Sequence, residues 1–339
     1  MQRNFILTDV MKTGNHLDFE DYINTHSLSD QTFDMTGEFY TLHNFDLDSY
    51  DRRFAIIDSR SDNLGLLHND YFEKDYHKRI ELLKSQNFVF IRANPWESVS
   101  TMQNTRAYPD VPVEHCLWTG DTTWFWWYMW RKHKDNLHNF EHGSKKYEFL
   151  YLNKTEKAHR SLLYELISDN VKERSLVSYW PSNKKLQPPY EDITPYPARG
   201  LDQDMVPRQY EDTKYSLLSE ATDANTEIFM TERLWKSMIA EHVFIVHGNY
   251  LYLQKLREMG FRTFNKYFDE SYDLEANSRV RAEKIADTCE SLLGKNWQDI
   301  YLNSKALRKH NKAHFLNKEK LSEQINKQIL IFLEFADRS

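Results

Sequence analysis

Short apolar runs alternate with segments of helical periodicity along the chain. Residues 54–57 (FAII) and 88–91 (FVFI) have the apolar character of buried strands. Between them, apolar residues recur at helical spacing over residues 71–84. Strand, helix and strand at this separation form a βαβ unit, whose strands are parallel. The first 145 residues therefore predict an α/β domain.

The same alternation returns after residue 146. It predicts four strands, at residues 149–152, 175–178, 215–219 and 243–246. It also predicts helices over residues 158–168, 231–240, 250–259, 275–293 and 318–336. Residues 181–212 hold six prolines and predict a long irregular segment. We therefore expect two domains, 1–145 and 146–339, each Rossmann-like, facing a cleft where a ligand binds.

Composition narrows the function classes. The 339 residues include only 9 glycines, and neither GxGxxG nor GxxxxGK[ST] occurs, which disfavours dehydrogenases and P-loop kinases. The two cysteines, Cys116 and Cys289, are too far apart in sequence for a CxxC pair and suggest a reducing compartment. A net charge of −7 argues against a protein that coats nucleic acid.

Two further absences concern localisation. Residues 1–11 lack the basic and apolar segments of a signal peptide, and no run of 18 apolar residues predicts a membrane span. We expect a soluble cytoplasmic protein, in the host cytoplasm if the source is viral.

One segment carries a candidate ligand site. Thr231 is a predicted helix N-cap, which places Glu232 in the first turn. The N–H groups and dipole of a helix start attract diphosphate oxygens, and the Glu232 carboxylate can accept two hydrogen bonds from ribose hydroxyls. Arg233 and Lys236 add positive charge for phosphate. In the alternative interpretation Glu232 only complements the helix dipole and the basic side chains are solvated.

Residues 229–236 (FMTERLWK), before a strand that ends near Gly248, resemble the donor-binding motif of α-1,3-fucosyltransferases and related GT-B glycosyltransferases. That motif has the form aromatic-x-Thr-Glu-Lys/Arg-x-Trp/Phe. The resemblance covers residues 146–295, and the closest overall similarity is to phage and marine-microbial proteins of this kind. Residues 240–244 (AEHVF) replace a small residue, Gly and Pro of the family, which leaves the sugar and base open.

The resemblance implies a GT-B transferase that moves a sugar from a nucleotide-sugar donor to an acceptor hydroxyl, with no metal or other cofactor. It implies that Arg160, at the start of the helix after residues 149–152, contacts the donor diphosphate and that Glu232 contacts the ribose. The donor-binding residues implied or predicted in this way are Arg160, Tyr215, Glu220, Thr231, Glu232, Arg233 and Lys236.

An inverting transferase also needs a base for the acceptor proton, which we expect from the N-terminal domain. Candidates follow predicted strands or the Trp118–Gly120 turn: Asp58, Asp62, Glu97 and Asp121. Each is equally compatible with a turn or capping role. A retaining enzyme would need none of them.

Competing signals leave alternatives open. Asp46 and Asp48 form a D-x-D, the metal-binding pattern of GT-A transferases. A non-catalytic GT-B-like module that binds nucleotides or glycans is a further alternative. The acceptor is predicted to be a glycan or a hydroxylated DNA base.

Basic and aromatic clusters bear on the acceptor. Eight basic or histidine residues after Asn303, with three after the Trp-rich stretch, would suit a DNA-tracking stripe or a solvated helix face. These are Lys305, Arg308, Lys309, His310, Lys312, His314, Lys318 and Lys320, with Arg131, Lys132 and Lys134. Four tryptophans, Trp124, Trp126, Trp127 and Trp130, could stack on an acceptor ring or fill a core.

Overall fold

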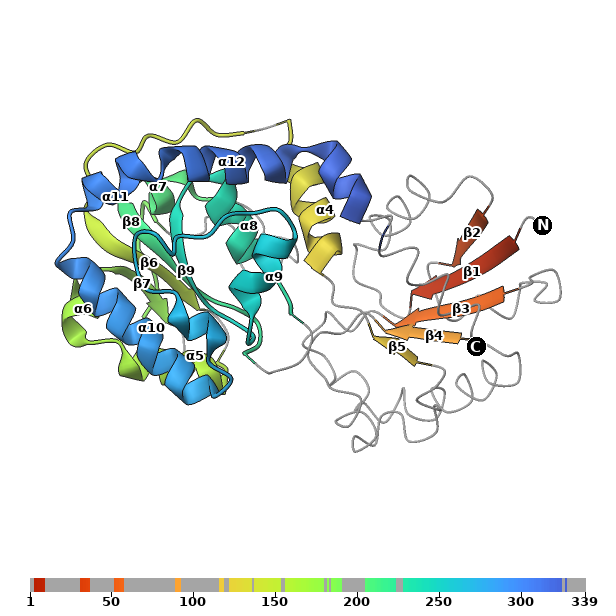
Figure 1. The fold of residues 1–339 in the computed structure, drawn as a ribbon, viewed down its shortest axis with the longest axis horizontal. Helices are drawn as coiled ribbons and strands as arrows, with labels where there is room; N and C mark the ends of the chain where they lie inside the picture. Colours follow the sequence, from red (N-terminus) through yellow and green to blue (C-terminus); the bar gives the residue numbers. More distant parts are fainter. Residues whose placement is uncertain are drawn as a thin grey trace. The chain divides into compact units, whose positions relative to one another are not determined.

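The computed structural model describes five strands between residues 3 and 118, then residues 122–324 except 136, 154–155, 180–181, 183, 191–204 and 224–227, and residue 327. The chain divides into two compact units. One comprises Met1–Trp124 and Leu321–Ser339, and the other comprises Phe125–Lys320. Each unit contains one parallel β-sheet (Figure 1).

The sheet of the first unit has the order β2-β1-β3-β4-β5, and every neighbouring pair is parallel. Its strands are β1 (Arg3–Asp9), β2 (Gln31–Thr36), β3 (Arg52–Ile57), β4 (Val89–Arg92) and β5 (Cys116–Trp118). The two strands predicted here, over residues 54–57 and 88–91, are confirmed as β3 and β4. The helix predicted over residues 71–84 lies outside the described residues.

The sheet of the second unit has the order β7-β6-β8-β9 and is also parallel throughout. Its strands are β6 (Tyr147–Asn153), β7 (Leu176–Tyr179), β8 (Thr213–Ser219) and β9 (Val243–His247), which confirms all four predicted strands. In this order the chain turns outward in opposite directions from β6 and β8. The carboxyl ends of these two strands are therefore a topological switch point, where open α/β sheets bind ligands.

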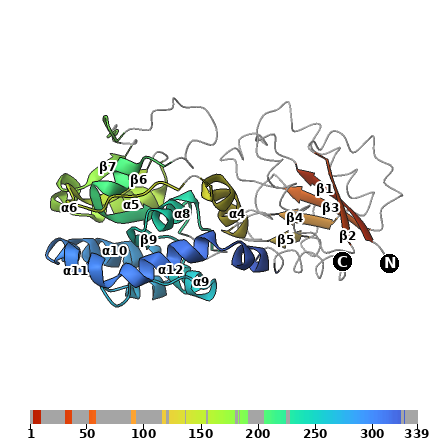
Figure 2. The ribbon, with the colours of Figure 1, turned by 90° about the horizontal axis from the view of Figure 1, so that it is seen from above.

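Helices cover both faces of this second sheet. They are α4 (Thr122–His133), α5 (Ala158–Leu166), α6 (Asp169–Glu173), α7 (Pro207–Glu211), α8 (Glu232–Ile239), α9 (Tyr252–Glu258), η7 (Ser271–Leu274), α10 (Ser278–Leu293), α11 (Trp297–Asn303) and α12 (Lys305–Leu316). Helices α4, α8 and α12 lie on one side of the strands, and α5 and α10 lie on the other (Figures 1 and 2). Within the described residues, none of the helices has the length and apolar character needed to span a bilayer.

Aromatic packing explains why the second unit begins at Phe125, ahead of the boundary expected at residue 145. The indole Nε1 of Trp126 donates to the carbonyl of Phe315 at 2.9 Å, and that of Trp130 donates to the carbonyl of Leu316 at 3.0 Å. Trp126 also stacks on Trp235 of α8, with ring centroids 5.7 Å apart. These contacts attach α4 to α8 and α12.

The same burial corrects one alternative from the sequence. Trp126, Trp127 and Trp130 are all buried. They belong to the core of the second unit and are not available to stack on an acceptor ring. The side chain of Trp124 lies outside the described residues.

Candidate anion-binding site

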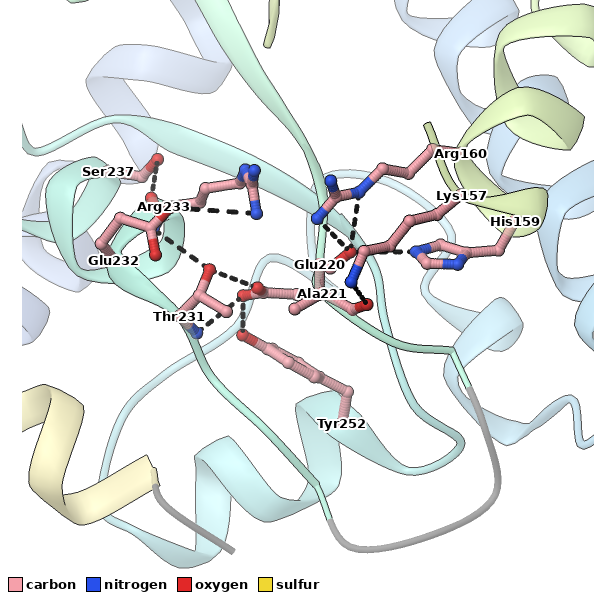
Figure 3. A network of polar contacts seen from close by, with 10 residues as sticks. All are labelled: Lys157, His159, Arg160, Glu220, Ala221, Thr231, Glu232, Arg233, Ser237 and Tyr252. Carbon is pink, nitrogen blue, oxygen red and sulfur yellow. Dashed lines mark hydrogen bonds and ion pairs between the residues drawn. The ribbon is translucent and has the colours of Figure 1, made fainter. Parts of the chain in front are cut away.

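Polar side chains from three segments meet where β8 ends (Figure 3). Glu220 directly follows β8, Arg160 lies in the first turn of α5 after β6, and Thr231 precedes α8. The segments meet at the switch point of the sheet because the connections after β6 and β8 leave it in opposite directions. The order of the strands in the sheet therefore brings Arg160 close to Glu220, although 60 positions separate them in sequence.

The start of α8 is built as the sequence predicts. The Thr231 hydroxyl accepts a hydrogen bond from the backbone N–H of Arg233 at 3.4 Å, which confirms it as the N-cap. Glu232 occupies the first turn, and its side chain stays partly exposed. The positive end of the helix and an acidic side chain are thus presented together.

Glu220 holds this helix start in place. Its carboxylate accepts hydrogen bonds from the Thr231 hydroxyl at 2.5 Å, the Thr231 N–H at 3.3 Å and the Tyr252 hydroxyl at 2.6 Å. The side chain is fully buried, and burial raises the pKa of Glu220. Because the chain itself occupies both carboxylate oxygens, we assign Glu220 to positioning Thr231 and not to binding a ligand directly.

Two arginines face each other across the site. Arg160 is buried and donates from Nε and Nη2 to the carbonyl of Glu220, at 3.1 and 3.0 Å. The guanidinium of Arg233, from α8, points toward that of Arg160 (Figure 3). Burial and the charge of Arg233 together lower the pKa of Arg160 to about 9. Arg160 therefore stays cationic at neutral pH, and its charge adds to that of Arg233 in the site.

A third cation borders the same carboxyl edge. Lys157, the N-cap residue of α5, donates from Nζ to the carbonyl of Ala221 at 3.1 Å. Glu232 lies 3.9 Å from Arg233, measured from Oε1 to Nη1. Lys236, the remaining basic residue predicted for the site, lies in the last turn of α8. The arrangement can bind an anion and offer a carboxylate beside it.

Sequence reasoning missed three residues of this neighbourhood. Tyr252 holds Glu220, and His159 contacts the Glu220 carbonyl through Nε2 at 2.9 Å. Asp223 lies 3.6 Å from the other ring nitrogen of His159. His159 could have been noticed because it directly precedes Arg160, but nothing in the local sequence marks Tyr252 or Asp223.

Tyr215 does not belong to the site. It lies within β8, paired with Phe149 and Val243, and it is fully buried. Four residues separate it from the end of the strand at Ser219, which is about 13 Å at the rise of a β-strand. The structure thus places Tyr215 in the core of the second unit, away from the residues gathered at the end of β8.

Several other predicted residues lie outside the described part of the chain. These are the candidate bases Asp58, Asp62, Glu97 and Asp121, and the D-x-D residues Asp46 and Asp48. Their roles stay predictions. Among the described residues, no group of three or more His, Cys, Asp or Glu side chains is placed to hold a metal ion.

Half of the basic cluster after Asn303 binds the protein's own chain. Arg308 is buried and donates to the carbonyls of Glu241 at 2.9 Å and Tyr301 at 2.7 Å. Three more contacts attach α12 to neighbouring loops: Lys312 to Glu241 Oε1, His310 to the carbonyl of Gly260, and His314 to the carbonyl of Met259. These contacts weaken the DNA-tracking alternative.

Comparison of the chain with profiles of known protein families, with curated proteins and with solved structures found no match. The site is therefore interpreted from its own geometry and chemistry.

Proposed function

We propose that this protein is a glycosyltransferase of the two-domain GT-B kind that binds the diphosphate of a nucleotide-sugar donor between Arg160 and Arg233. The facing guanidinium groups carry the proposal (Figure 3). Two like charges held close, one of them buried, repel each other and have lost hydration. A diphosphate between them would offset both costs and accept several charge-assisted hydrogen bonds.

The surroundings of the pair support the same ligand. The site lies at the switch point of a parallel sheet, next to the start of α8, where backbone N–H groups favour phosphate. Glu232, 3.9 Å from Arg233, is placed to accept hydrogen bonds from the ribose hydroxyls. An anion site with an adjacent carboxylate fits a nucleoside diphosphate better than free phosphate.

The proposed chemistry follows from this charge distribution. The bond between the sugar C1 and the diphosphate oxygen breaks, and the acceptor hydroxyl oxygen forms the new bond to C1. Arg160 and Arg233 stabilise the negative charge that develops on the leaving diphosphate. In an inverting enzyme the hydroxyl proton passes to a carboxylate, for which Asp58, Asp62 and Asp121 are the candidates. The acceptor is a glycan or a hydroxylated DNA base.

A thermal-unfolding panel tests the proposal. UDP, GDP, CDP and ADP, each with a corresponding sugar conjugate, are added to the protein, and the midpoint of unfolding is measured. A ligand present at about 100 times its Kd stabilises the folded protein by about 2.7 kcal/mol. We expect one nucleotide series to raise the midpoint and Glu232→Ala to abolish both this rise and sugar transfer, with an unchanged midpoint for the free protein.

Two outcomes would overturn the assignment. The first is that no nucleotide raises the midpoint of the wild-type protein. The second is that Glu232→Ala keeps wild-type transfer. Slow hydrolysis of the donor in the absence of acceptor would separate an active transferase from a module that only binds nucleotides.

A further inference from the structure

A row of polar side chains crosses the carboxyl edge of the second sheet. Asn153, Ser219 and His247 are the last residues of β6, β8 and β9. Ser219 pairs with His247, and the pairing of Leu150 with Ser216, three residues earlier in each strand, places Asn153 beside Ser219. Residues in register on neighbouring strands point to the same face of a sheet. The three side chains therefore lie side by side on one face.

This row lacks hydrogen-bond partners. The three side chains are at most 1% exposed. Both amide atoms of Asn153, the hydroxyl of Ser219 and both ring nitrogens of His247 have no hydrogen bond within the described part of the chain. The Tyr151 hydroxyl lies close to the side chains of Ser219 and Asn153, but it donates its own proton to the carbonyl of Arg160. Buried polar groups are almost always bonded, and each one left unpaired costs about 1–3 kcal/mol.

His159 connects the row to the proposed anion site. Its ring packs edge-on against His247, with centroids 5.5 Å apart. Its Nε2 contacts the Glu220 carbonyl, the same oxygen to which Arg160 donates. Asp223, beside His159, is partly exposed.

His159, which packs against His247 of the row, lies on the opposite side of the anion site from Glu232. In Figure 3, Glu232 and His159 flank the facing guanidinium groups of Arg160 and Arg233 from the two sides. A ligand whose diphosphate lies between the arginines, with one end at Glu232, would direct its other end toward His159.

The row is uncharged at neutral pH. Burial, with the charge of Lys157 and Arg160 nearby, lowers the pKa of His159 to about 4 despite the opposing effect of Asp223. Burial, with the neighbouring His159, lowers the pKa of His247 to about 3. Imidazole, amide and hydroxyl groups in neutral form can both donate and accept hydrogen bonds. They suit a ligand group that does the same and carries no charge.

We infer that Asn153, Ser219 and His247 recognise an uncharged group rich in hydroxyls or amides that is attached to the bound diphosphate on the side away from Glu232. This inference rests on the proposed diphosphate site. The chemistry fits the transferred sugar, if that sugar is neutral, because the base is attached to the ribose on the Glu232 side. An acidic sugar such as a uronic acid would lose affinity there, because a carboxylate would find no cation in the row.

Calorimetric titration of the full-length protein tests the inference. The probes are inorganic pyrophosphate, UDP, GDP, UDP-glucose and GDP-mannose, with wild type and His247→Leu. We expect one conjugate to bind wild type at least about tenfold more tightly than its own nucleoside diphosphate, which corresponds to a difference of about 1.4 kcal/mol in binding free energy. His247→Leu should lose most of this gain and bind the nucleoside diphosphate and pyrophosphate as wild type does.

Comparing successive ligands in the titration identifies the part of the ligand that the row binds. A loss in the step from nucleoside diphosphate to conjugate assigns the row to the sugar, and a loss already in the step from pyrophosphate to nucleoside diphosphate would contradict the inference. Asn153→Leu repeats the test should His247→Leu fail to fold.

A gain that survives in both variants would overturn this inference and leave the diphosphate site intact. Failure of wild type to bind any of the five compounds would overturn the proposed function along with it.

Discussion

The two ends of the second sheet each hold a pair of histidines, and in the described part of the chain only one pair has a hydrogen bond at every ring nitrogen. At the amino end, His242 Nδ1 contacts the Ser216 hydroxyl and Nε2 contacts the Thr213 carbonyl, both at 2.8 Å. His142 contacts the Ala240 carbonyl and the Lys145 ammonium group, at 2.8 and 3.0 Å. Every ring nitrogen there has a partner supplied by the chain.

At the carboxyl end, the described part of the chain does not supply a hydrogen bond to every ring nitrogen. His247 has no hydrogen bond at either nitrogen among the described residues, and His159 has one, to Glu220. Burial is the largest cause of the lowered pKa in all four histidines. The difference therefore lies in bonding alone. Because the fold supplies hydrogen bonds to the histidines at one end and not to all of those at the other, we expect a ligand to supply the missing bonds at the carboxyl end.

The arginines repeat this contrast and give the largest expected effects. Arg308, near the amino end, donates to two carbonyls and to the Ser304 hydroxyl. Arg160 donates to the carbonyl of Glu220 and faces Arg233. We expect Arg308→Met to lower the free energy of unfolding by about 3 kcal/mol, since buried acceptors lose their donor, and to leave nucleotide affinity unchanged.

Arg160→Met should weaken nucleotide binding and change the free energy of unfolding little. It removes a charged contact to the diphosphate and should weaken donor binding by roughly 100-fold, while relief of the repulsion with Arg233 keeps the loss of stability small. Urea unfolding and titration with the nucleotide identified in the thermal panel measure both quantities for both variants. Equal losses of stability in the two would break the comparison.

A matched pair of histidine variants tests the bonding difference directly. His242→Leu leaves Ser216 and Thr213 without a partner and should cost about 2 kcal/mol in the free energy of unfolding. His247→Leu removes no hydrogen bond seen in the structure and replaces a buried polar ring by an apolar side chain of similar size. We expect a change near zero, or a gain in stability.

Urea unfolding of the two variants without ligand measures this difference. A loss of about 2 kcal/mol in His247→Leu as well would mean that the chain itself satisfies that ring, and the polar row would then be an ordinary part of the core.

Much of the second unit could be predicted from local sequence. Strands β6 and β9 contain the apolar runs 149–152 and 243–246, as buried parallel strands do, and the Thr231 cap with Glu232 in the first turn is a local signal. Arg160 and Arg233 were identified on the sequence through a resemblance and a charge pattern. Their facing geometry depends on strand order, which no local pattern encodes.

The errors share a physical cause. Basic residues after Asn303 carry charge in the sequence but no mark of burial, so Arg308 could not be separated from exposed neighbours such as Lys309. The polar row was missed because Asn153, Ser219 and His247 come from three strands and become neighbours only through sheet register. Contacts between residues distant in sequence decide both cases.

The smallest expected effect concerns acid stability. The folded-state pKa of His247, about 3, lies below the ordinary value of 6.5. Below pH 6.5 this histidine is therefore protonated in the unfolded chain and still neutral in the folded protein. The free energy of unfolding falls as the pH falls from 6.5 toward the folded-state pKa. Between pH 6.5 and 5.5 one such histidine costs about 1 kcal/mol.

His247→Leu should lose this contribution, so its free energy of unfolding should fall less steeply than that of wild type across the same interval. His242→Leu should flatten the curve equally, because burial keeps both rings neutral whatever their hydrogen bonds. Urea unfolding at pH 7.0, 6.5, 6.0 and 5.5 measures the slopes. A wild-type slope in His247→Leu would show that His247 is charged in the folded protein, and an uncharged ligand group would then no longer be the expected partner of the polar row.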